Sequence, residues 1–400
     1  MENAVLEREL VACSGLRLLE LGLVERTWGN VSSRVGDEYF AITPSGVSYT
    51  SLLASDVVLV NIHTLSFNAT KRPSSELHIH AKIYSKFSNT NFILHTHQKW
   101  ASLLSLFCAT KVGIIELPFQ YHNILGKRLP CAKYAQAGTE EIANNVIDAI
   151  INADFNDFQS SSGIVLMASH GVVVFAKDKN EAFSLVENLE LIAKNIVKKK
   201  LSVGTLLEFT LSMLNFDMSM QGKIFDITKN KNSFCNNELS KLFPFLVDDR
   251  ILGSSFSCFF APFSNINVIS YATNICYTQK NILYTNNLSP FFYEIMAYFD
   301  DVAQIAGAFF KLLDLESAQV SFEDIFLAFE DSNVLILKDY GMLIRSSSNE
   351  DAFSTINLLE KNIYAFLLSL HDPNILPLSV QNARELHVSY LKGYSKLKDK

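Results

Sequence analysis

The sequence predicts an α/β fold. Segments with apolar residues at helical spacing alternate with short segments rich in β-branched residues, which indicates helices packed against a sheet. A length of 400 residues, with 48% hydrophobic and 19% charged residues, favours two globular domains. A third observation is that a pattern in residues 164–190 returns 170 positions later, which indicates a second, related domain.

The first domain is expected to open with an amphipathic helix over residues 7–21, where apolar residues fall at helical spacing and Gly22 ends the pattern. Short strands are predicted within residues 28–35, 38–46 and 56–62, because turn residues separate them. A helix follows from Glu76 to Phe87, with Ser74 or Ser75 placed to cap its N-terminus.

The rest of the first domain continues this alternation. A strand over residues 91–98 precedes a helix over 101–110. Residues 138–151 are predicted as a helix, because Thr139 can cap it and acidic residues occupy its first turn. Two strands surround His170 and Gly171, and a long amphipathic helix covers residues 180–200. Residues 206–248 have weak periodicity and are interpreted as a connector.

The second domain is predicted to be a shortened, degenerate copy of the first. Four segments of the first domain match segments that lie 170 positions later. In the first domain they are Ile164-Val165-Leu166-Met167, Gly171, Ala182-Phe183-Ser184 and Leu189-Glu190. Their counterparts, in the same order, are Val334-Leu335-Ile336-Leu337, Gly341, Ala352-Phe353-Ser354 and Leu359-Glu360. Tyr340 stands where the first copy has His170, and no H-x-H triplet follows residue 200. The sequence therefore divides into a first domain at 1–205, the connector at 206–248 and a metal-free copy at 249–400.

Charge and cysteine content exclude several classes of function. A formal net charge of −7 and a pI near 5.8 provide no field that would attract nucleic acid or an anionic membrane. Six widely spaced cysteines without a C-x-x-C pair are interpreted as buried, reduced thiols: Cys13, Cys108, Cys131, Cys235, Cys258 and Cys276. Neither a signal peptide nor a membrane span is predicted, so the expected compartment is the cytoplasm.

Two histidines in one predicted strand are candidate metal ligands. His95 and His97 are two positions apart, so both imidazoles project from one face and can reach one ion, while Thr96 points the other way. Their spacing alone leaves open that they are merely polar strand positions. A second triplet, with His78 and His80, lies on a predicted helix, where positions two apart diverge.

Five short motifs occur in an order that resembles the class II aldolase and adducin family, most closely its fuculose-phosphate aldolase type. They are Trp28-Gly29-Asn30-Val31-Ser32, Ile42-Thr43-Pro44-Ser45-Gly46, Pro73-Ser74-Ser75-Glu76, His95-Thr96-His97 and Ser169-His170-Gly171. The resemblance extends to Pro130-Cys131-Ala132-Lys133-Tyr134-Ala135 and Gly138-Thr139, and it covers residues 1–205. It implies a three-layer α/β/α domain with a mostly antiparallel central sheet, in a protein that forms homo-oligomers.

The resemblance also implies a Zn²⁺ ion held by His95, His97 and His170, with the Glu76 carboxylate beside it as a ligand or proton carrier. Three neutral imidazoles leave zinc its full charge and an open position, so it can bind substrate oxygens and stabilise the charge that develops when an adjacent carbon–carbon bond breaks. Taken alone, Glu76 would be interpreted as an acid that stabilises a helix start.

Further site residues follow from the resemblance. Positions matching the family's phosphate contacts are Gly29, Asn30, Ser45, Gly46, Ser74 and Ser75, although each pair alone is typical of a turn or a helix cap. The family's tyrosine proton donor has a counterpart in Tyr121, with Glu116 or a residue of another subunit as the alternatives. His80 is interpreted as a hydrogen-bonding residue behind the ligands.

The sequence thus predicts a zinc-dependent lyase that cleaves a ketose 1-phosphate into dihydroxyacetone phosphate and a short aldehyde. The resemblance implies that glutamate at position 76, rather than aspartate, favours carbon–carbon cleavage over epimerisation. Epimerisation, dehydration or decarboxylation of a similar sugar phosphate is the first alternative. The second is a non-enzymatic interaction protein that resembles the head of adducin.

Overall fold

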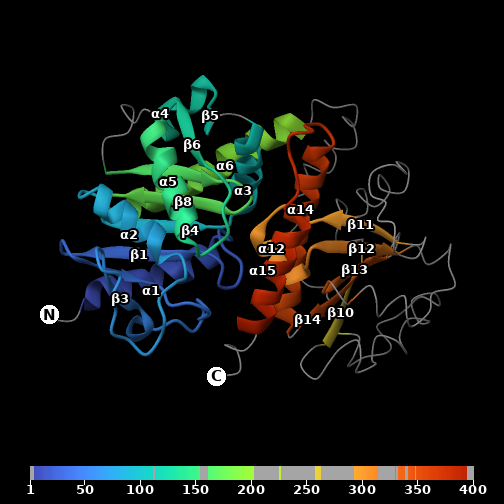
Figure 1. Cartoon of the computed structure of the whole chain (residues 1–400), viewed down its shortest axis with the longest axis horizontal. Helices are drawn as coiled ribbons and strands as arrows, with labels where there is room; N and C mark the ends of the chain where they lie inside the picture. The colour runs from blue at the N-terminus through green and yellow to red at the C-terminus, as the bar shows by residue number, and fades with distance from the viewer. Residues whose placement is uncertain are drawn as a thin grey trace. The chain divides into compact units, whose positions relative to one another are not determined.

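The structure is a computed structural model, and it describes residues 4–110, 113–153, 161–201, 225–226, 257–262, 292–313, 329, 332–337, 341–346 and 348–393. These residues form two compact units, the first within residues 1–200 and the second comprising most of residues 201–393 (Figure 1). No helix in the described part of the chain is long and apolar enough to cross a membrane. The predicted connector at 206–248 lies almost entirely outside the described residues.

Among the described residues, the first unit is built on an eight-stranded sheet with strand order β3-β2-β1-β4-β8-β7-β6-β5. Its strands are β1 (Asn30–Val35), β2 (Tyr39–Ile42), β3 (Val58–Asn61), β4 (Phe92–Thr96), β5 (Ile114–Glu116), β6 (Arg128–Ala132), β7 (Gly163–Met167) and β8 (Gly171–Ala176). All neighbouring strands are antiparallel except β6 and β7, which are parallel. The prediction of an α/β unit with a mostly antiparallel sheet is confirmed.

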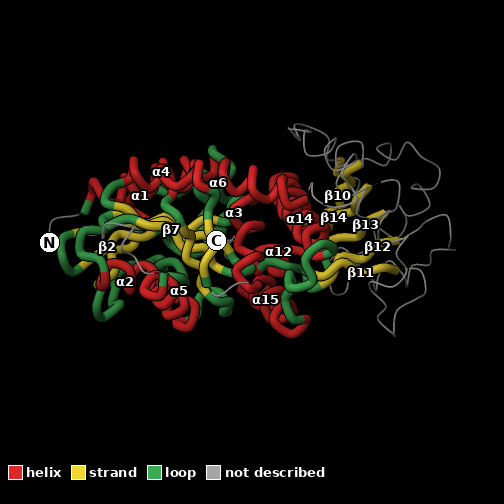
Figure 2. The backbone as a smooth tube through the Cα atoms, turned by 90° about the horizontal axis from the view of Figure 1, so that it is seen from above, coloured by secondary structure: helices red, strands yellow, loops and turns green. Residues whose placement is uncertain are grey.

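Helices cover both faces of this sheet. They are α1 (Val5–Glu20), α2 (Leu77–Lys86), α3 (Lys99–Ser105), α4 (His122–Leu125), α5 (Glu140–Asn152) and α6 (Lys179–Leu201), with short 3-10 turns η1 (Ala54–Asp56), η2 (Leu106–Thr110) and η3 (Phe119–Tyr121). Figure 2 shows α1 and α6 on one side of the strands and α2 and α5 on the other. Ile83 of α2 and Val146 of α5 pack with Val173 of the sheet in a buried apolar cluster, which fixes α2 against the strands.

Helix starts differ from the sequence prediction in their details. The N-cap residue of α2 is Glu76 itself, and the Ser74 hydroxyl accepts a hydrogen bond from the Glu76 N–H at 3.3 Å. Thr139 is the N-cap of α5, but its hydroxyl donates to the Gln136 carbonyl instead of capping the helix. Helix α3 begins at Lys99, earlier than predicted, because the distant Glu190 carboxylate accepts the N–H groups of its first turn.

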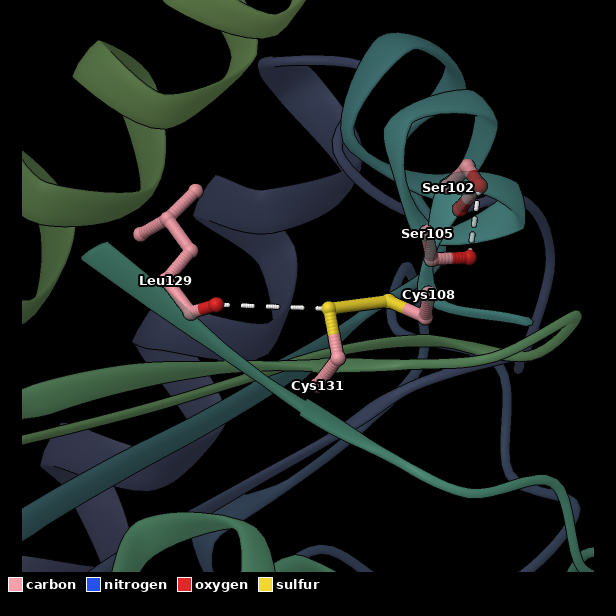
Figure 3. The surroundings of a disulfide bond; sticks show 5 residues. All are labelled: Ser102, Ser105, Cys108, Leu129 and Cys131. Atoms are coloured by element: carbon pink, nitrogen blue, oxygen red, sulfur yellow. Dashed lines mark hydrogen bonds between the residues drawn. A yellow bond between two sulfur atoms is a disulfide. The ribbon is translucent and has the colours of Figure 1, made fainter. Parts of the chain in front are cut away.

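The cysteine prediction was wrong for Cys108 and Cys131, which are not free thiols, and for the burial of Cys13. Cys108 and Cys131 form a disulfide with their Cα atoms 5.5 Å apart, whereas Cys13 is free and exposed (Figure 3). The partners are separated by 23 positions, and only the approach of η2 to β6 brings them within bonding distance. Cys235 and Cys276 lie outside the described residues.

In the described part of the second unit, six strands form a sheet with the order β11-β12-β13-β14-β10-β9. The strands are β9 (Phe225–Asp226), β10 (Ser257–Pro262), β11 (Phe292–Met296), β12 (Phe309–Leu313), β13 (Val334–Leu337) and β14 (Gly341–Ser346). The helices are α12 (Asp300–Ala306), α14 (Asn349–Ser369) and α15 (Val380–Gly393). Tyr340, predicted to replace the third histidine, lies outside the described residues.

The two sheets have the same pattern of strands. From β11 to β9 the second sheet repeats the order β5-β6-β7-β8-β4-β1, with the same sequence of antiparallel and parallel neighbours. The register agrees as well, because Met167 faces Gly171 in the first sheet and Leu337 faces Gly341 in the second. Strands β2 and β3 have no counterpart among the described residues of the second unit.

Candidate metal centre

Three histidine side chains converge at the end of strand β4. His95 lies within the strand, His97 follows its last residue, and His170 comes from the turn between β7 and β8. All three are buried, and their ligand atoms lie within 4.8 Å of one another. The sequence-predicted ligands are therefore brought together from two segments 73 positions apart, counted from His97 to His170.

The turn that carries His170 is tightly packed against strand β4. Ser169 has a φ of 55°, in the left-handed region that residues other than glycine rarely adopt. Strand β8 begins two residues later, at Gly171. A Cβ atom on Gly171 would lie 2.4 Å from the Thr96 carbonyl oxygen and 3.2 Å from the His95 ring. Only glycine therefore allows β8 to bring His170 this close to the other two rings.

The orientation of His95 suits a metal ligand. Its Nδ1 lies 2.9 Å from the Val172 carbonyl oxygen, which can only accept, so Nδ1 carries a proton and Nε2 is the nitrogen directed into the site. The His95 Nε2 lies 2.9 Å from the His97 Nε2. Two nitrogen ligands on a tetrahedral zinc ion, each about 2.0–2.1 Å from it, stand roughly 3.3 Å apart. The His95 and His97 rings therefore fit a divalent cation after a small outward movement.

Glu76 completes the donor set. Its Oε1 lies 2.9 Å from the His170 Nε2, its Oε2 lies 3.1 Å from the His95 Nε2, and the side chain is almost fully buried. Burial by itself would raise the pKa of Glu76, but His95 and His170 beside it hold that pKa well below its usual value of 4.5. Glu76 is thus a carboxylate at the centre of the site.

The residues predicted to contact phosphate lie near one another. Pro44 and Pro73 form a bridge that places Ser45-Gly46 beside Ser74-Ser75. The N–H groups of Ser45 and Ser74 donate to the backbone carbonyl oxygens of Arg72 and Thr43, so these two N–H groups are already used within the protein. Gly29 has a φ of 101° and lies so close to β4 that a Cβ atom would meet the His95 carbonyl oxygen at 2.6 Å.

The predicted proton donor follows the edge strand of the sheet. Tyr121 ends η3 after the edge strand β5, four strand positions from β4, which is a lateral offset of about 19 Å at about 4.8 Å per strand. Within the described residues its hydroxyl makes no hydrogen bond. Glu116 is exposed and lies 3.9 Å from Arg128. Tyr121 and Glu116 thus belong to the edge of the sheet, and their role as proton donor stays a prediction.

The sequence did not reveal what the Asn30 side chain contacts. Predicted as a phosphate contact, its amide Nδ2 instead donates to the Glu76 Oε2 at 2.8 Å, and its Oδ1 faces His80. Ser32 and Tyr84, which extend these contacts, were not singled out. Their signal was present in the spacing, because Ser32 lies two strand positions after Asn30 and Tyr84 lies one helical turn after His80.

These features define a class of protein: an α/β protein with a buried candidate metal centre of three imidazoles and one carboxylate. Residues 8–197 match the model for the Class II Aldolase and Adducin N-terminal domain. A 5-deoxy-D-ribulose 1-phosphate aldolase of Bacillus thuringiensis serovar kurstaki is 30% identical over 201 residues, which cover 50% of this chain and 87% of that protein. The chain therefore belongs to the class II aldolase and adducin family, through its N-terminal half.

Two further relatives illustrate the similarity. An L-fuculose phosphate aldolase of Methanococcus maripaludis is 32% identical over 167 residues, which cover 42% of this chain and 82% of that protein. A solved structure of an L-fuculose 1-phosphate aldolase matches 54% of this chain and 99% of its own, with 26% sequence identity and a TM-score of 0.44. The family match does not extend into the second unit.

Proposed function

We propose that the first unit is a metal-dependent lyase that cleaves a ketose 1-phosphate into dihydroxyacetone phosphate and a short aldehyde, and that its metal is zinc. The observation that carries the proposal is the buried set of three Nε2 atoms with the Glu76 carboxylate among them. The names of the relatives support the substrate class, since both denote aldolases of ketose phosphates. A three-histidine set that retains an open position is typical of catalytic rather than structural zinc.

The residues of the site divide the chemistry among them. When bound, the ion supplies a Lewis acid for neighbouring carbonyl and hydroxyl oxygens of the sugar. Cleavage requires one proton to leave a hydroxyl group and another to reach the carbon that keeps the electron pair of the broken bond. We assign the transfer at carbon to Glu76, whose Oε1 and Oε2 face the centre of the site. Ser45, Gly46, Ser74 and Ser75, with Gly29 and the Asn30 backbone, are proposed to hold the phosphate.

The proton transfer at the hydroxyl group needs a second residue. Tyr121 is our proposal, and its lateral offset from β4 favours a Tyr121 that belongs to another copy of this chain. Glu116 is the alternative within the same segment. Homo-oligomer formation is therefore part of the proposed function.

Replacing Glu76 with glutamine tests the assignment of the proton transfer. Glutamine preserves the size of the side chain but cannot carry a proton between substrate atoms, so we expect kcat to fall by about 10²–10⁴-fold while the three histidines still bind metal. The measurement is product formation from a panel of ketose 1-phosphates, together with metal content. Wild-type products other than dihydroxyacetone phosphate and an aldehyde would establish epimerisation, dehydration or decarboxylation instead. A wild-type chain that binds metal and turns over none of the panel would favour the adducin-like alternative.

We infer further that the second unit is a degenerate, metal-free copy of the first, and that it begins before the predicted boundary at 249, because β9 (Phe225–Asp226) pairs in its sheet. The shared strand order supports this inference. Leu343 lies 170 positions after Val173, and it pairs with Phe260 as Val173 pairs with His95, so Phe260 occupies the position of His95. By the same register, Pro262, which faces Gly341, occupies the position of His97. Phenylalanine and proline side chains offer no ligand atom.

A chain that ends at residue 205 tests this inference. We expect its metal content per chain to equal that of the full chain, because all proposed ligands precede residue 205. The full chain should likewise bind one ion and not two. A second ion in the full chain that is lost on truncation would contradict a metal-free copy, whereas undiminished activity and unchanged assembly of the shorter chain would show that the second half is dispensable.

A further inference from the structure

A line of buried polar side chains runs from Glu76 away from the histidines, along the contact between β1 and α2. Strand β1 contributes Asn30 and Ser32, which point to the same face because side chains alternate along a strand. Helix α2 and its cap contribute Glu76, His80 and Tyr84, which share one face at intervals of four residues. Two residues rise about 6.6 Å along a strand and four residues rise about 6.0 Å along a helix, so successive side chains of β1 and α2 remain opposite one another.

The contacts alternate between the strand and the helix. The Asn30 Nδ2 lies 2.8 Å from the Glu76 Oε2, and the Asn30 Oδ1 contacts the His80 Nε2. The Ser32 Oγ lies 2.6 Å from the His80 Nδ1 and 2.8 Å from the Tyr84 hydroxyl oxygen. Each of the four residues behind Glu76 is at most 2% exposed, so water does not substitute for these contacts.

Arg34, the next residue on the same face of β1, closes the far end of the line. Its guanidinium lies over the Tyr84 ring, with the carbon 4.8 Å from the ring centroid, and it donates to the Tyr84 carbonyl oxygen at 2.7 Å and to the Phe87 carbonyl oxygen at 3.0 Å. These bonds tie the last turn of α2 to β1. The helix therefore cannot slide along the strand without breaking them.

Hydrogen-bonding rules fix the direction of every donor in this line. The Glu76 carboxylate can only accept, so Asn30 presents its amide N–H to Glu76 and its carbonyl oxygen to His80. The His80 Nε2 must then carry a proton. Burial, with a smaller effect of His95, lowers the pKa of His80 to about 3, so the ring is neutral and Nδ1 accepts.

The remaining directions follow from an accepting Nδ1 on His80. The Ser32 hydroxyl donates to that nitrogen, and the Tyr84 hydroxyl donates to Ser32. All donors thus point toward Glu76. The Asn30 amide in the middle cannot release a proton and accept another as a hydroxyl group does, so the line orients groups and does not conduct protons.

We propose that His80, Ser32 and Tyr84 are positioning residues that act through Asn30 to hold the Glu76 carboxylate in the orientation that the reaction needs. The proposal rests on the proposed function, because orientation of Glu76 matters only where Glu76 moves a proton. The Asn30 amide holds Oε2, which leaves Oε1 toward His170 and the centre of the site. Without a fixed Asn30 amide, the orientation of the carboxylate depends only on its contacts with His95 and His170.

A matched pair of variants at His80 separates positioning from mere packing. The amide nitrogen of glutamine reaches the position of the His80 Nε2 and can still donate to Asn30. The amide of the shorter asparagine reaches only the position of the His80 Nδ1, where it can contact Ser32 but not Asn30. We expect His80→Asn to lower kcat by about 10–100-fold, with metal content unchanged and KM within about twofold. His80→Gln should recover most of that loss. His78→Asn, on the same helix but outside the line, is the control.

Two outcomes overturn the proposal. One is equal loss in the asparagine and glutamine variants, or a loss that appears in KM and metal content rather than in kcat. The other concerns the wild-type chain, in which NMR of the imidazole nitrogens should show a neutral His80 protonated at Nε2; protonation at Nδ1 would refute the donor order even if both variants failed to fold. A wild-type chain inactive on every ketose phosphate would refute the proposed function, while the His80 tautomer would still decide the donor order.

Discussion

Replacement of His95, His97 or His170 with alanine is expected to remove nearly all bound metal and all measurable lyase activity. Each substitution removes one of the three imidazole ligands, which weakens binding of the ion and disrupts the geometry that leaves a coordination position open to substrate. The loss of activity should exceed the effect of removing a single transition-state hydrogen-bond donor, which is about 10²–10³-fold. Metal analysis of the purified variants, with kcat measured on the ketose 1-phosphate panel, checks the expectation.

Controls distinguish a lost ligand from a damaged fold. His63 is exposed on the first unit, so His63→Ala should keep full metal content and activity. Circular dichroism of each ligand variant should match that of the wild type, because the helices and strands around the site have their own apolar core. Full metal occupancy in all three variants would contradict the proposed centre.

The elements of the first unit were predictable because their signals are local. The helix at α2 and the strand at β4 follow from apolar spacing, and the shared face of His95 and His97 follows from the strand period. The start of α3 and the cap of α2 were not predictable, since a carboxylate 90 positions away, Glu190, binds the first turn of α3, and the cap of α2 is Glu76 instead of Ser74 or Ser75.

The site was predictable only in part. No periodicity connects His170 with His95, so it was the resemblance to a family, and not spacing, that placed His170 among the ligands. The role of the Asn30 side chain depends on which face of β1 the helix α2 covers, which the sequence of neither element states. The pairing of Cys108 with Cys131 could not be predicted for the same reason, because it depends on the approach of η2 to β6 in the folded chain.

In the second unit, the fixed separation of 170 positions predicted the strands β13 and β14 and the helix α14. It did not predict β10, because nothing in the sequence of β10 resembles strand β4, which carries His95. The correspondence of these two strands appears only when the strand order and register of the sheets are compared.

Lys361→Met is expected to destabilise the second unit by about 3–5 kcal/mol in the free energy of unfolding, the range for breaking a buried ion pair by removing one partner. The Lys361 Nζ lies 2.6 Å from the Asp301 Oδ2, and the two side chains are 2% and 0% exposed. Methionine fills a similar volume, so packing is largely kept. The loss therefore arises because a buried carboxylate no longer faces an ammonium group.

The double variant Lys361→Met with Asp301→Asn separates charge from packing. It removes both charges, while the oxygen of the new side-chain amide can still accept the Val302 N–H, which the Asp301 carboxylate accepts at 2.8 Å, so most of the lost stability should return. Both tryptophans, Trp28 and Trp100, belong to the first unit, so tryptophan fluorescence follows that unit and circular dichroism follows both. In denaturant, Lys361→Met should shift the circular-dichroism transition and leave the fluorescence transition and the metal content in place. A fluorescence transition that moved by the same amount would show instead that the two units unfold together.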